Sequence, residues 1–359
     1  MNTKRHTKII YSCEPEKLDY NAYEELKNNI DALRITYSPS KIEKIISFAK
    51  KVVKARESKQ LPPLMMDVSY RPRAVVVDLK TPMEVSSGDS VSISCEKNLG
   101  DIQISTQEWN KLFKKDARVY LGYGDICANV SKVDSSIAVL EIVHEGIVYN
   151  NMELHIPETY TPASIFDLSF IDIGPFLDLA IDYVIIPGIP SKRQIGLIRK
   201  KLLTATTPIW IITKVDSKQA YESLDEILEV SDGVMISRND LGLTMDPASV
   251  PLLVKDIIKR CRQKARAVFV ASEMLATMKY NFFPTRAEVS DIANAAGDQA
   301  DAVVISSDIS LGSHVQRSLQ LTNNILCDIE AYSKTEETFS SIETEVGDLF
   351  SSVAFHSYI

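Results

Sequence analysis

Short apolar runs rich in isoleucine and valine recur along the chain. There are eight of them, at residues 8–12, 33–37, 64–68, 183–187, 209–214, 233–238, 267–272 and 302–307. Each run is continuous rather than alternating, which is typical of strands that are buried on both faces of a parallel sheet. The pattern therefore predicts eight buried parallel strands.

Amphipathic stretches with helical spacing separate most of these runs, at residues 41–55, 194–203, 217–229 and 250–264. In the last stretch, Leu252, Leu253, Ile257 and Ile258 recur between charged residues, as on one face of a helix. Eight alternations of strand and helix predict an α/β protein with a (β/α)8 TIM barrel. A doubly wound open sheet is the alternative, but no Gly-x-Gly-x-x-Gly or Walker-type loop follows any strand.

One long gap interrupts the alternation, between the third and fourth runs. Residues 76–159 show no helical period and contain alternating segments such as 90–94 and 137–143, bounded by turn residues. This predicts a small all-β domain, a barrel-like lid, inserted after barrel strand 3. The barrel then comprises residues 1–75 and 160–335, close to the ~250 residues of a typical one. Residues 336–359 are expected to form a short helical tail.

Charge and cysteine content narrow the class of protein. The chain has 40 basic and 48 acidic residues, a net charge of −8, which argues against a nucleic-acid partner. No run of 18 apolar residues is present, so no membrane span is expected. The N-terminus has no apolar signal core, and the five cysteines are scattered without a C-x-x-C pair. These features favour a cytoplasmic protein with reduced thiols.

Polar residues stand at the carboxyl ends of the predicted strands, where a barrel of this kind carries its active site. They are Ser12, Thr36, Ser38, Asp67, Lys214, Asp216, Arg238, Asp240, Ser272, Ser306 and Asp308. Any one of them alone is more often an ordinary rim residue. Their recurrence at the ends of seven of the eight strands favours a functional site.

The types of these residues suit phosphoryl transfer. Asp216 and Asp240 follow neighbouring strands, so their carboxylates could share one Mg²⁺ or Mn²⁺ ion, which prefers oxygen ligands. Lys214 and Arg34 add positive charge for a phosphoryl group or an enolate. Catalysis of phosphoryl transfer consists mainly of positioning and charge neutralisation. The simpler alternative is a rim salt bridge between Lys214 and Asp216.

Six segments, taken in order, resemble the pyruvate kinase family over residues 7 to about 335. They are residues 7–10, 33–38, 209–216, 231–242, 269–275 and 284–294, the last of which reads Pro-Thr-Arg-Ala-Glu-Val-Ser-Asp-Ile-Ala-Asn. The family also carries a β domain after its third barrel strand. The resemblance implies conversion of phosphoenolpyruvate and ADP to pyruvate and ATP in glycolysis, with Mg²⁺ and K⁺ as cofactors.

The resemblance also implies roles for particular residues. Lys214 would stabilise the phosphoryl group and the enolate, Arg34 would contact the phosphoryl group, and Ser272 would assist proton delivery to the enolate carbon. The backbone at Arg238, Asn239 and Asp240 would receive the substrate carboxylate, and Asp216 with Asp240 would hold Mg²⁺. The K⁺ positions correspond to Thr36, Ser38, Asp67 and the carbonyl of Val68, and the nucleotide positions to Ser12, Pro15 and Arg73.

Several of these positions depart from the family pattern. The metal-ligand glutamate is Asp216, the K⁺-site asparagine and threonine are Thr36 and Val68, and the glycine before Asp240 is Asn239. The length also leaves no room for the C-terminal effector domain. Two main hypotheses remain: an active phosphotransferase, or an impaired paralogue that serves as a structural or regulatory subunit beside active pyruvate kinase subunits, in a homo- or hetero-oligomer. A third is another Mg²⁺-dependent enolate enzyme.

Overall fold

The computed structural model describes residues 5–68, 75–105, 109–122, 124–150, 152–157, 173–179, 181–188 and 191–340. The chain divides into two compact units. The first comprises residues 1–70, 168–238 and 248–359, and the second comprises residues 71–167 and 239–247.

The first unit contains a closed barrel of eight parallel strands in the order β1-β17-β16-β15-β14-β13-β3-β2. These strands are β1 (Lys8–Cys13), β2 (Ala32–Thr36), β3 (Leu64–Asp67), β13 (Tyr183–Ile186), β14 (Trp210–Val215), β15 (Gly233–Ser237), β16 (Ala267–Ala271) and β17 (Ala302–Ile305). Each coincides with one of the eight apolar runs. The predicted fold class, a TIM barrel with a separate inserted β domain, is confirmed.

Side chains from all eight strands fill the barrel interior. The buried cluster there includes Ile10, Met65, Ile212 and Phe269, each no more than 1% exposed. Residues one position along the strands, such as Ile9 on β1, are equally buried, as expected where helices cover the outer surface of the barrel. Burial on both faces explains why the strand sequences are continuously apolar rather than alternating.

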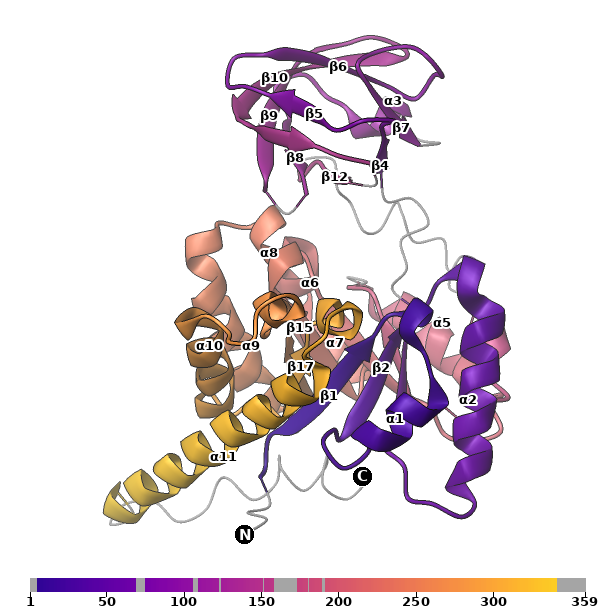
Figure 1. Cartoon of the computed structure of the whole chain (residues 1–359), viewed down its shortest axis with the longest axis vertical. Helices are drawn as coiled ribbons and strands as arrows, with labels where there is room; N and C mark the ends of the chain where they lie inside the picture. The colour runs from indigo at the N-terminus through magenta and orange to yellow at the C-terminus, as the bar shows by residue number, and fades with distance from the viewer. Residues whose placement is uncertain are drawn as a thin grey trace. The chain divides into compact units, whose positions relative to one another are not determined.

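Helices surround the barrel strands (Figure 1). The α-helices are α1 (Tyr20–Leu26), α2 (Ile42–Arg56), α5 (Lys192–Leu202), α6 (Lys218–Glu222), α7 (Leu224–Val230), α9 (Val250–Gln263), α10 (Arg286–Gly297) and α11 (Val315–Ser340). Short 3₁₀ helices are η1 (Pro15–Lys17), η2 (Pro39–Lys41), η4 (Gly174–Phe176), η5 (Pro247–Ser249), η6 (Ala276–Lys279) and η7 (Ser307–Leu311). The stretch expected as one helix at 217–229 is two, which meet at Ser223.

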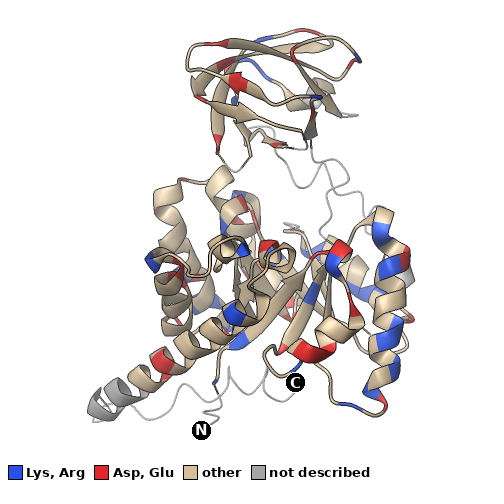
Figure 2. Cartoon of the chain, viewed as in Figure 1, with Lys and Arg blue, Asp and Glu red and all other residues tan. Residues whose placement is uncertain are grey.

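Helix α2 illustrates how the spacing of apolar residues determines which face of an outer helix packs on the barrel. Ile45, Phe48, Ala49 and Val52 are buried at helical spacing, whereas the remaining positions carry most of its charges. Figure 2 shows basic residues along this helix. The apolar stripe therefore packs on the barrel and the basic face meets solvent.

Four aspartates repeat the same contact at the N-terminal end of the barrel. They immediately precede the second, fourth, sixth and eighth strands of the barrel, which are β2, β13, β15 and β17. The carboxylate of each aspartate accepts a hydrogen bond from a backbone N–H of the preceding barrel strand. The backbone N–H of the aspartate donates in return to the carbonyl of that same residue. The pairs are Asp31 with Ile9, Asp182 with Leu64, Asp232 with Ile211 and Asp301 with Val268, with side-chain bonds of 2.7, 2.7, 2.7 and 2.8 Å. These reciprocal bonds fix the register of four strand pairs at this end.

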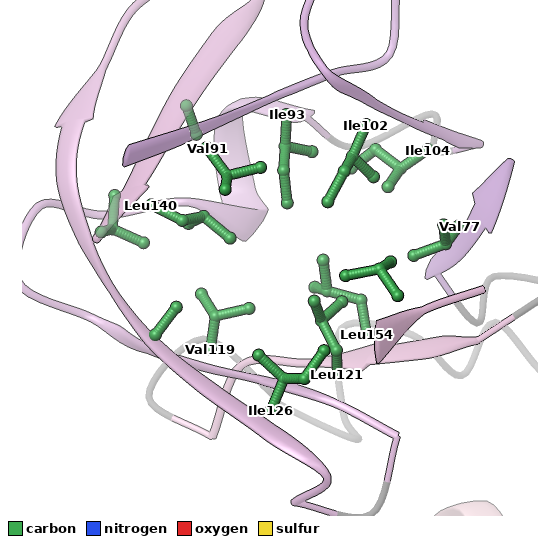
Figure 3. Packing of buried hydrophobic residues seen from close by; sticks show 14 of the residues in the cluster. Val77, Val91, Ile93, Ile102, Ile104, Val119, Leu121, Ile126, Leu140 and Leu154 are labelled. Carbon is green, nitrogen blue, oxygen red and sulfur yellow. The ribbon is translucent and has the colours of Figure 1, made fainter. Parts of the chain in front are cut away.

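The second unit contains a closed barrel of seven strands in the order β10-β6-β7-β4-β12-β8-β9, and a two-stranded sheet of β11 and β5. Its elements are β4 (Val75–Asp78), β5 (Met83–Val85), β6 (Ser90–Ser94), β7 (Ile102–Ser105), α3 (Trp109–Leu112), β8 (Arg118–Leu121), β9 (Ile126–Val133), β10 (Ile137–His144), β11 (Gly146–Val148) and β12 (Glu153–His155). Alternate residues of its strands, such as Ile93, Ile102 and Leu140, point into a closed apolar core (Figure 3).

Helix α11 continues to Ser340, beyond residue 335, where the sequence placed the end of the barrel. The rest of the expected tail, residues 341–359, lies outside the described residues. Among the helices of the described part of the chain, none combines the length and apolarity that a membrane span needs.

Candidate active site

Residues from several strands meet at the carboxyl end of the barrel. Arg34 lies on β2, Asp67 ends β3 and Lys214 lies near the end of β14. Parallel strands in a closed barrel present all their carboxyl ends on one rim, and the side chains there come from segments far apart in sequence.

Asp67 is the centre of a buried ionic cluster. One of its carboxylate oxygens lies 3.1 Å from the Lys214 Nζ and accepts a 2.9 Å hydrogen bond from the Arg34 Nε. A second nitrogen of the Arg34 guanidinium also donates to this oxygen, and a third contact joins Arg34 to the Ser12 hydroxyl at 3.0 Å. Two cations thus surround one carboxylate, which leaves an excess of positive charge that can attract an anionic group.

Asp216 follows β14 and is 3% exposed. One carboxylate oxygen accepts a 3.3 Å hydrogen bond from the backbone N–H of Gly188. A Cβ atom added to Gly188 would lie 2.3 Å from the other carboxylate oxygen, so only glycine lets the carboxylate approach this closely. The absence of a side chain at Gly188 therefore accommodates the position that Asp216 takes.

The donor chemistry at Asp216 fits a Mg²⁺ ion, which takes oxygen ligands and binds proteins through one or two carboxylates. Within the described ranges, no group of three or more His, Cys, Asp or Glu residues is placed to hold a metal. A Mg²⁺ ion here would take its remaining ligands from water and substrate, as this ion commonly does.

Arg238 and Ser272 are joined at the ends of β15 and β16. The Arg238 guanidinium donates 2.9 Å to the Ala271 carbonyl, donates also to the Ser272 carbonyl, and pairs with Asp291 of α10. Ser272 has φ of +83°, in the left-handed region that a residue with a Cβ atom rarely adopts. Such backbone strain persists only where the surroundings enforce it, and it clusters at functional sites.

The ion pair between the side chains of Arg238 and Asp291 was not predicted from the sequence. The sequence assigned only the backbone at this position to substrate binding. Asp291 lies within the motif 284–294, yet its partner could not be read from spacing because 53 residues separate the two. A charged residue directly after a buried strand was the available signal.

Asn239 and Asp240 lie in the first turn of α8 (Arg238–Thr244), immediately after β15. Both residues belong to the second unit, within its segment 239–247. Strands β14 and β15 pair in parallel, with Lys214 opposite Met235.

The residues expected to hold K⁺ make contacts of their own within the barrel rim. Val68 has no side-chain oxygen, and its N–H donates 2.9 Å to the Ile185 carbonyl. The Asp67 carbonyl accepts a hydrogen bond from Tyr37, and one oxygen of its carboxylate contacts both Arg34 and Lys214. Ser38 shares a hydrogen bond with the hydroxyl of Ser40, and Thr36 is half-buried. The assignment of these residues to a K⁺ ion stays a prediction.

Two of the three residues expected at a nucleotide pocket, Ser12 and Pro15, are buried. The Ser12 hydroxyl is buried and bonded to Arg34, and Pro15 is buried at the start of η1. Arg73, and Arg71 beside it, lie outside the described residues.

The fold defines a (β/α)8-barrel protein with an inserted β domain. The family model described as pyruvate kinase, barrel domain, matches residues 4–319. The chain therefore belongs to the pyruvate kinase family.

Individual relatives agree with this assignment. A pyruvate kinase of Thermotoga maritima is 25% identical over 371 residues, covering 98% of this chain and 76% of the relative. A pyruvate kinase of Mycobacterium intracellulare is 29% identical over 249 residues, covering 68% of this chain and 53% of the relative. The crystal structure of a pyruvate kinase from Cryptosporidium parvum superposes with a TM-score of 0.77 at 21% identity, covering 96% of this chain and 74% of that one. The chain thus spans between about half and three quarters of these relatives.

Proposed function

We propose that the protein transfers the phosphoryl group of phosphoenolpyruvate to ADP, giving pyruvate and ATP, as a cytoplasmic enzyme of glycolysis. The observation that carries the proposal is the convergence of Lys214 and Arg34 on Asp67 at the barrel rim. Membership of the pyruvate kinase family supports the same reaction.

The two cations suit the phosphoryl group. In the transfer, an oxygen of the ADP β-phosphate attacks the phosphorus and the bond from phosphorus to the enol oxygen breaks. Charge spreads over the equatorial phosphoryl oxygens and the departing enolate oxygen. Lys214 and Arg34, both about 15% exposed and already gathered at one point, can neutralise that charge without reorganising.

Ser272 is proposed to deliver the proton that the enolate carbon takes up to become pyruvate. Its backbone is held by Arg238, which in turn is paired with Asp291. A hydroxyl on a fixed backbone keeps its distance from a bound reactant, and such positioning contributes to rate. The backbone of Arg238, Asn239 and Asp240 is proposed to bind the substrate carboxylate, since the N–H groups at the start of a helix favour anions.

Asp216 and Asp240 are proposed to hold Mg²⁺. They follow β14 and β15, which pair in parallel. When bound, the ion would neutralise charge on the phosphoryl and enolate oxygens. Asp216 has one methylene fewer than the glutamate of the family pattern, and the missing Cβ of Gly188 lets its carboxylate lie close to the backbone of that residue.

A coupled assay of pyruvate formation, with Mg²⁺, phosphoenolpyruvate and ADP at saturation, tests the proposal. We expect turnover that Lys214→Met abolishes. Lys218→Met is the matched control, since Lys218 lies on exposed α6 and is 58% exposed. A wild-type rate no higher than that of Lys214→Met would refute the proposed enzymatic activity.

The alternative is an impaired paralogue that acts as a structural or regulatory subunit. It predicts no turnover, together with association with an active pyruvate kinase subunit in size-exclusion chromatography with light scattering. Binding of phosphoenolpyruvate with normal affinity, measured by calorimetry, counts against it. Assembly into homo- or hetero-oligomers is proposed on the family resemblance.

A further inference from the structure

We propose that the C-terminal part of α11, together with the residues that follow it, forms a coiled coil with the same segment of a second copy of this chain. This surface lies away from the barrel rim and is independent of the proposed reaction. It gives the chain a specific contact for self-association.

Helix α11 extends past the barrel that it covers. Four residues of its first turns are fully buried, namely Ser318, Leu319, Thr322 and Leu326. Glu330 then accepts hydrogen bonds of 2.7 and 2.8 Å from the N–H groups of His6 and Thr7, directly before β1, and so lies at the N-terminal end of the barrel. Residues 331–340 continue the helix for about 15 Å, and Figure 1 shows this end of α11 beyond the other helices.

The projecting part of α11 gains little from the barrel. Of the α11 side chains that the structure describes, none after Leu326 is buried, and Tyr332 is 59% exposed. A helix of this length is marginal in water without tertiary packing. Serine and threonine, which are weak helix formers, recur within residues 333–341. The projecting part therefore needs a stabilising contact that the barrel does not supply.

A heptad period marks the face on which this contact lies. Ten positions follow one another at alternating intervals of four and three residues, the spacing of the seam of a coiled coil. These seam positions are Leu321, Ile325, Asp328, Tyr332, Thr335, Phe339, Ile342, Val346, Leu349 and Val353, of which eight are apolar. In the structure Leu321 and Ile325 are half-buried, and Asp328 and Tyr332 are exposed. From residue 334 onward the period is a property of the sequence.

The continuity of the period identifies the occupant as a second chain. The spacing keeps its phase across Ser340, where the described helix ends, and no glycine or proline interrupts residues 327–346. A tail that folded back on α11 would need a turn there and would lose the phase. A helix cannot cover its own face, and the seam of a second copy matches this one in length and spacing.

Sedimentation equilibrium of the full chain tests the surface. We expect a self-association step that the double variant Ile342→Ser, Leu349→Ser weakens at least about tenfold, because two apolar seam positions are lost. Both residues follow the part of α11 that packs on the barrel, so the variant should keep the unfolding temperature of the barrel. The matched control is Leu203→Ser, Leu252→Ser, which changes two leucines that are 79% and 71% exposed elsewhere and should leave association unchanged.

Asp328→Leu gives the converse test. Burial of a carboxylate on the seam opposes association, so we expect this variant to associate at least about tenfold more tightly. Glu57→Leu, which adds an exposed leucine at the end of α2, should have no such effect.

Three results would each overturn the proposal. One is association that the seam variants do not change, and another is an equal change in the control variants. The third is a wild-type chain that stays monomeric at every concentration. If the double seam variant of such a monomer also unfolded at a lower temperature, the tail would be folding back within one chain.

Discussion

Lys214 reaches Asp67 across an entire intervening strand: the ammonium lies 3.1 Å from the carboxylate, although β13 separates β14 from β3 in the barrel. Arg34 meets the same carboxylate from β2, on the other side of β3. One buried carboxylate therefore ties together three strands that are far apart in the sequence, and it holds the two cations that the proposed reaction needs.

Removal of the Asp67 charge should destabilise the barrel unit. In Asp67→Asn, two largely buried cations lose their shared counter-charge, so we expect a loss of about 3 kcal/mol in the free energy of unfolding. The shift of the urea midpoint measures it. Asp134→Asn is the control, since its ion pair with Lys132 is exposed and should contribute less than about 0.5 kcal/mol. Equal midpoints for the two variants would show that the cluster adds nothing.

A methyl group at position 188 should displace the Asp216 carboxylate. The new Cβ in Gly188→Ala would lie 2.3 Å from a carboxylate oxygen and 2.9 Å from the Lys214 carbonyl. We expect a loss of about 1–3 kcal/mol in stability and at least about tenfold weaker Mg²⁺ binding by calorimetry.

Gly196→Ala is the matched control for this substitution. No atom lies within 4 Å of its added Cβ, and Gly196 lies inside α5, so the variant should gain up to about 1 kcal/mol. Unchanged Mg²⁺ affinity in Gly188→Ala would mean that Asp216 does not hold the ion.

Glycine and alanine at position 272 should separate the effect of backbone strain on stability from the effect of the Ser272 hydroxyl on the reaction rate. Glycine adopts φ of +83° without strain and alanine does not, so Ser272→Gly should be more stable than Ser272→Ala by about 1 kcal/mol. Both lack the hydroxyl, and both should slow pyruvate formation by about 10²-fold. Chemical denaturation and the coupled assay measure the two effects, and a full rate in either variant would remove Ser272 from the mechanism.

Stability should also depend on pH through Asp301. Burial raises the pKa of its carboxyl group to about 6 in the folded protein, although the Val268 N–H and Arg262 oppose this shift. The folded state therefore binds the proton more tightly than the unfolded chain, whose aspartate pKa is about 3.9. The resulting stability is present at low pH and is lost as the pH rises through 6.

Asp301→Asn should remove this contribution. Between pH 4 and pH 6.5 the free energy of unfolding of the variant should fall less steeply with pH than that of the wild-type chain. Over the whole range the difference should be on the order of 1–3 kcal/mol. Denaturation series at several pH values measure the slope. Asp134→Asn, at an exposed position, should leave it unchanged, and identical slopes for the wild-type chain and Asp301→Asn would contradict the assignment.

The sequence predicted the strands well because burial on both faces imposes a continuous apolar composition. The run at residues 233–238, for example, became β15, and the charged Arg238 marks the point where burial ends. The prediction of one helix at 217–229 was less accurate, because the break at Ser223 depends on local backbone geometry rather than on apolar spacing.

The contacts within the site could not be predicted in the same way. Spacing suggested Lys214 and Asp216 as neighbours, whereas the pairing of Lys214 with Asp67 depends on the curvature of the closed barrel. The approach of Gly188 to Asp216 similarly depends on two strand ends meeting in space. The roles assigned to Asp216 and Ser272 remain predictions that the variants above test, and the role assigned to Asp240 also remains a prediction.

The four aspartates at the N-terminal end of the barrel have a consequence for how this protein can evolve. Their reciprocal backbone bonds join the strands in pairs, at the end away from the rim where the candidate site lies. Substitutions at the rim therefore act on residues that the strand register does not depend on. A lineage with this arrangement can exchange side chains at the rim and still inherit the same barrel.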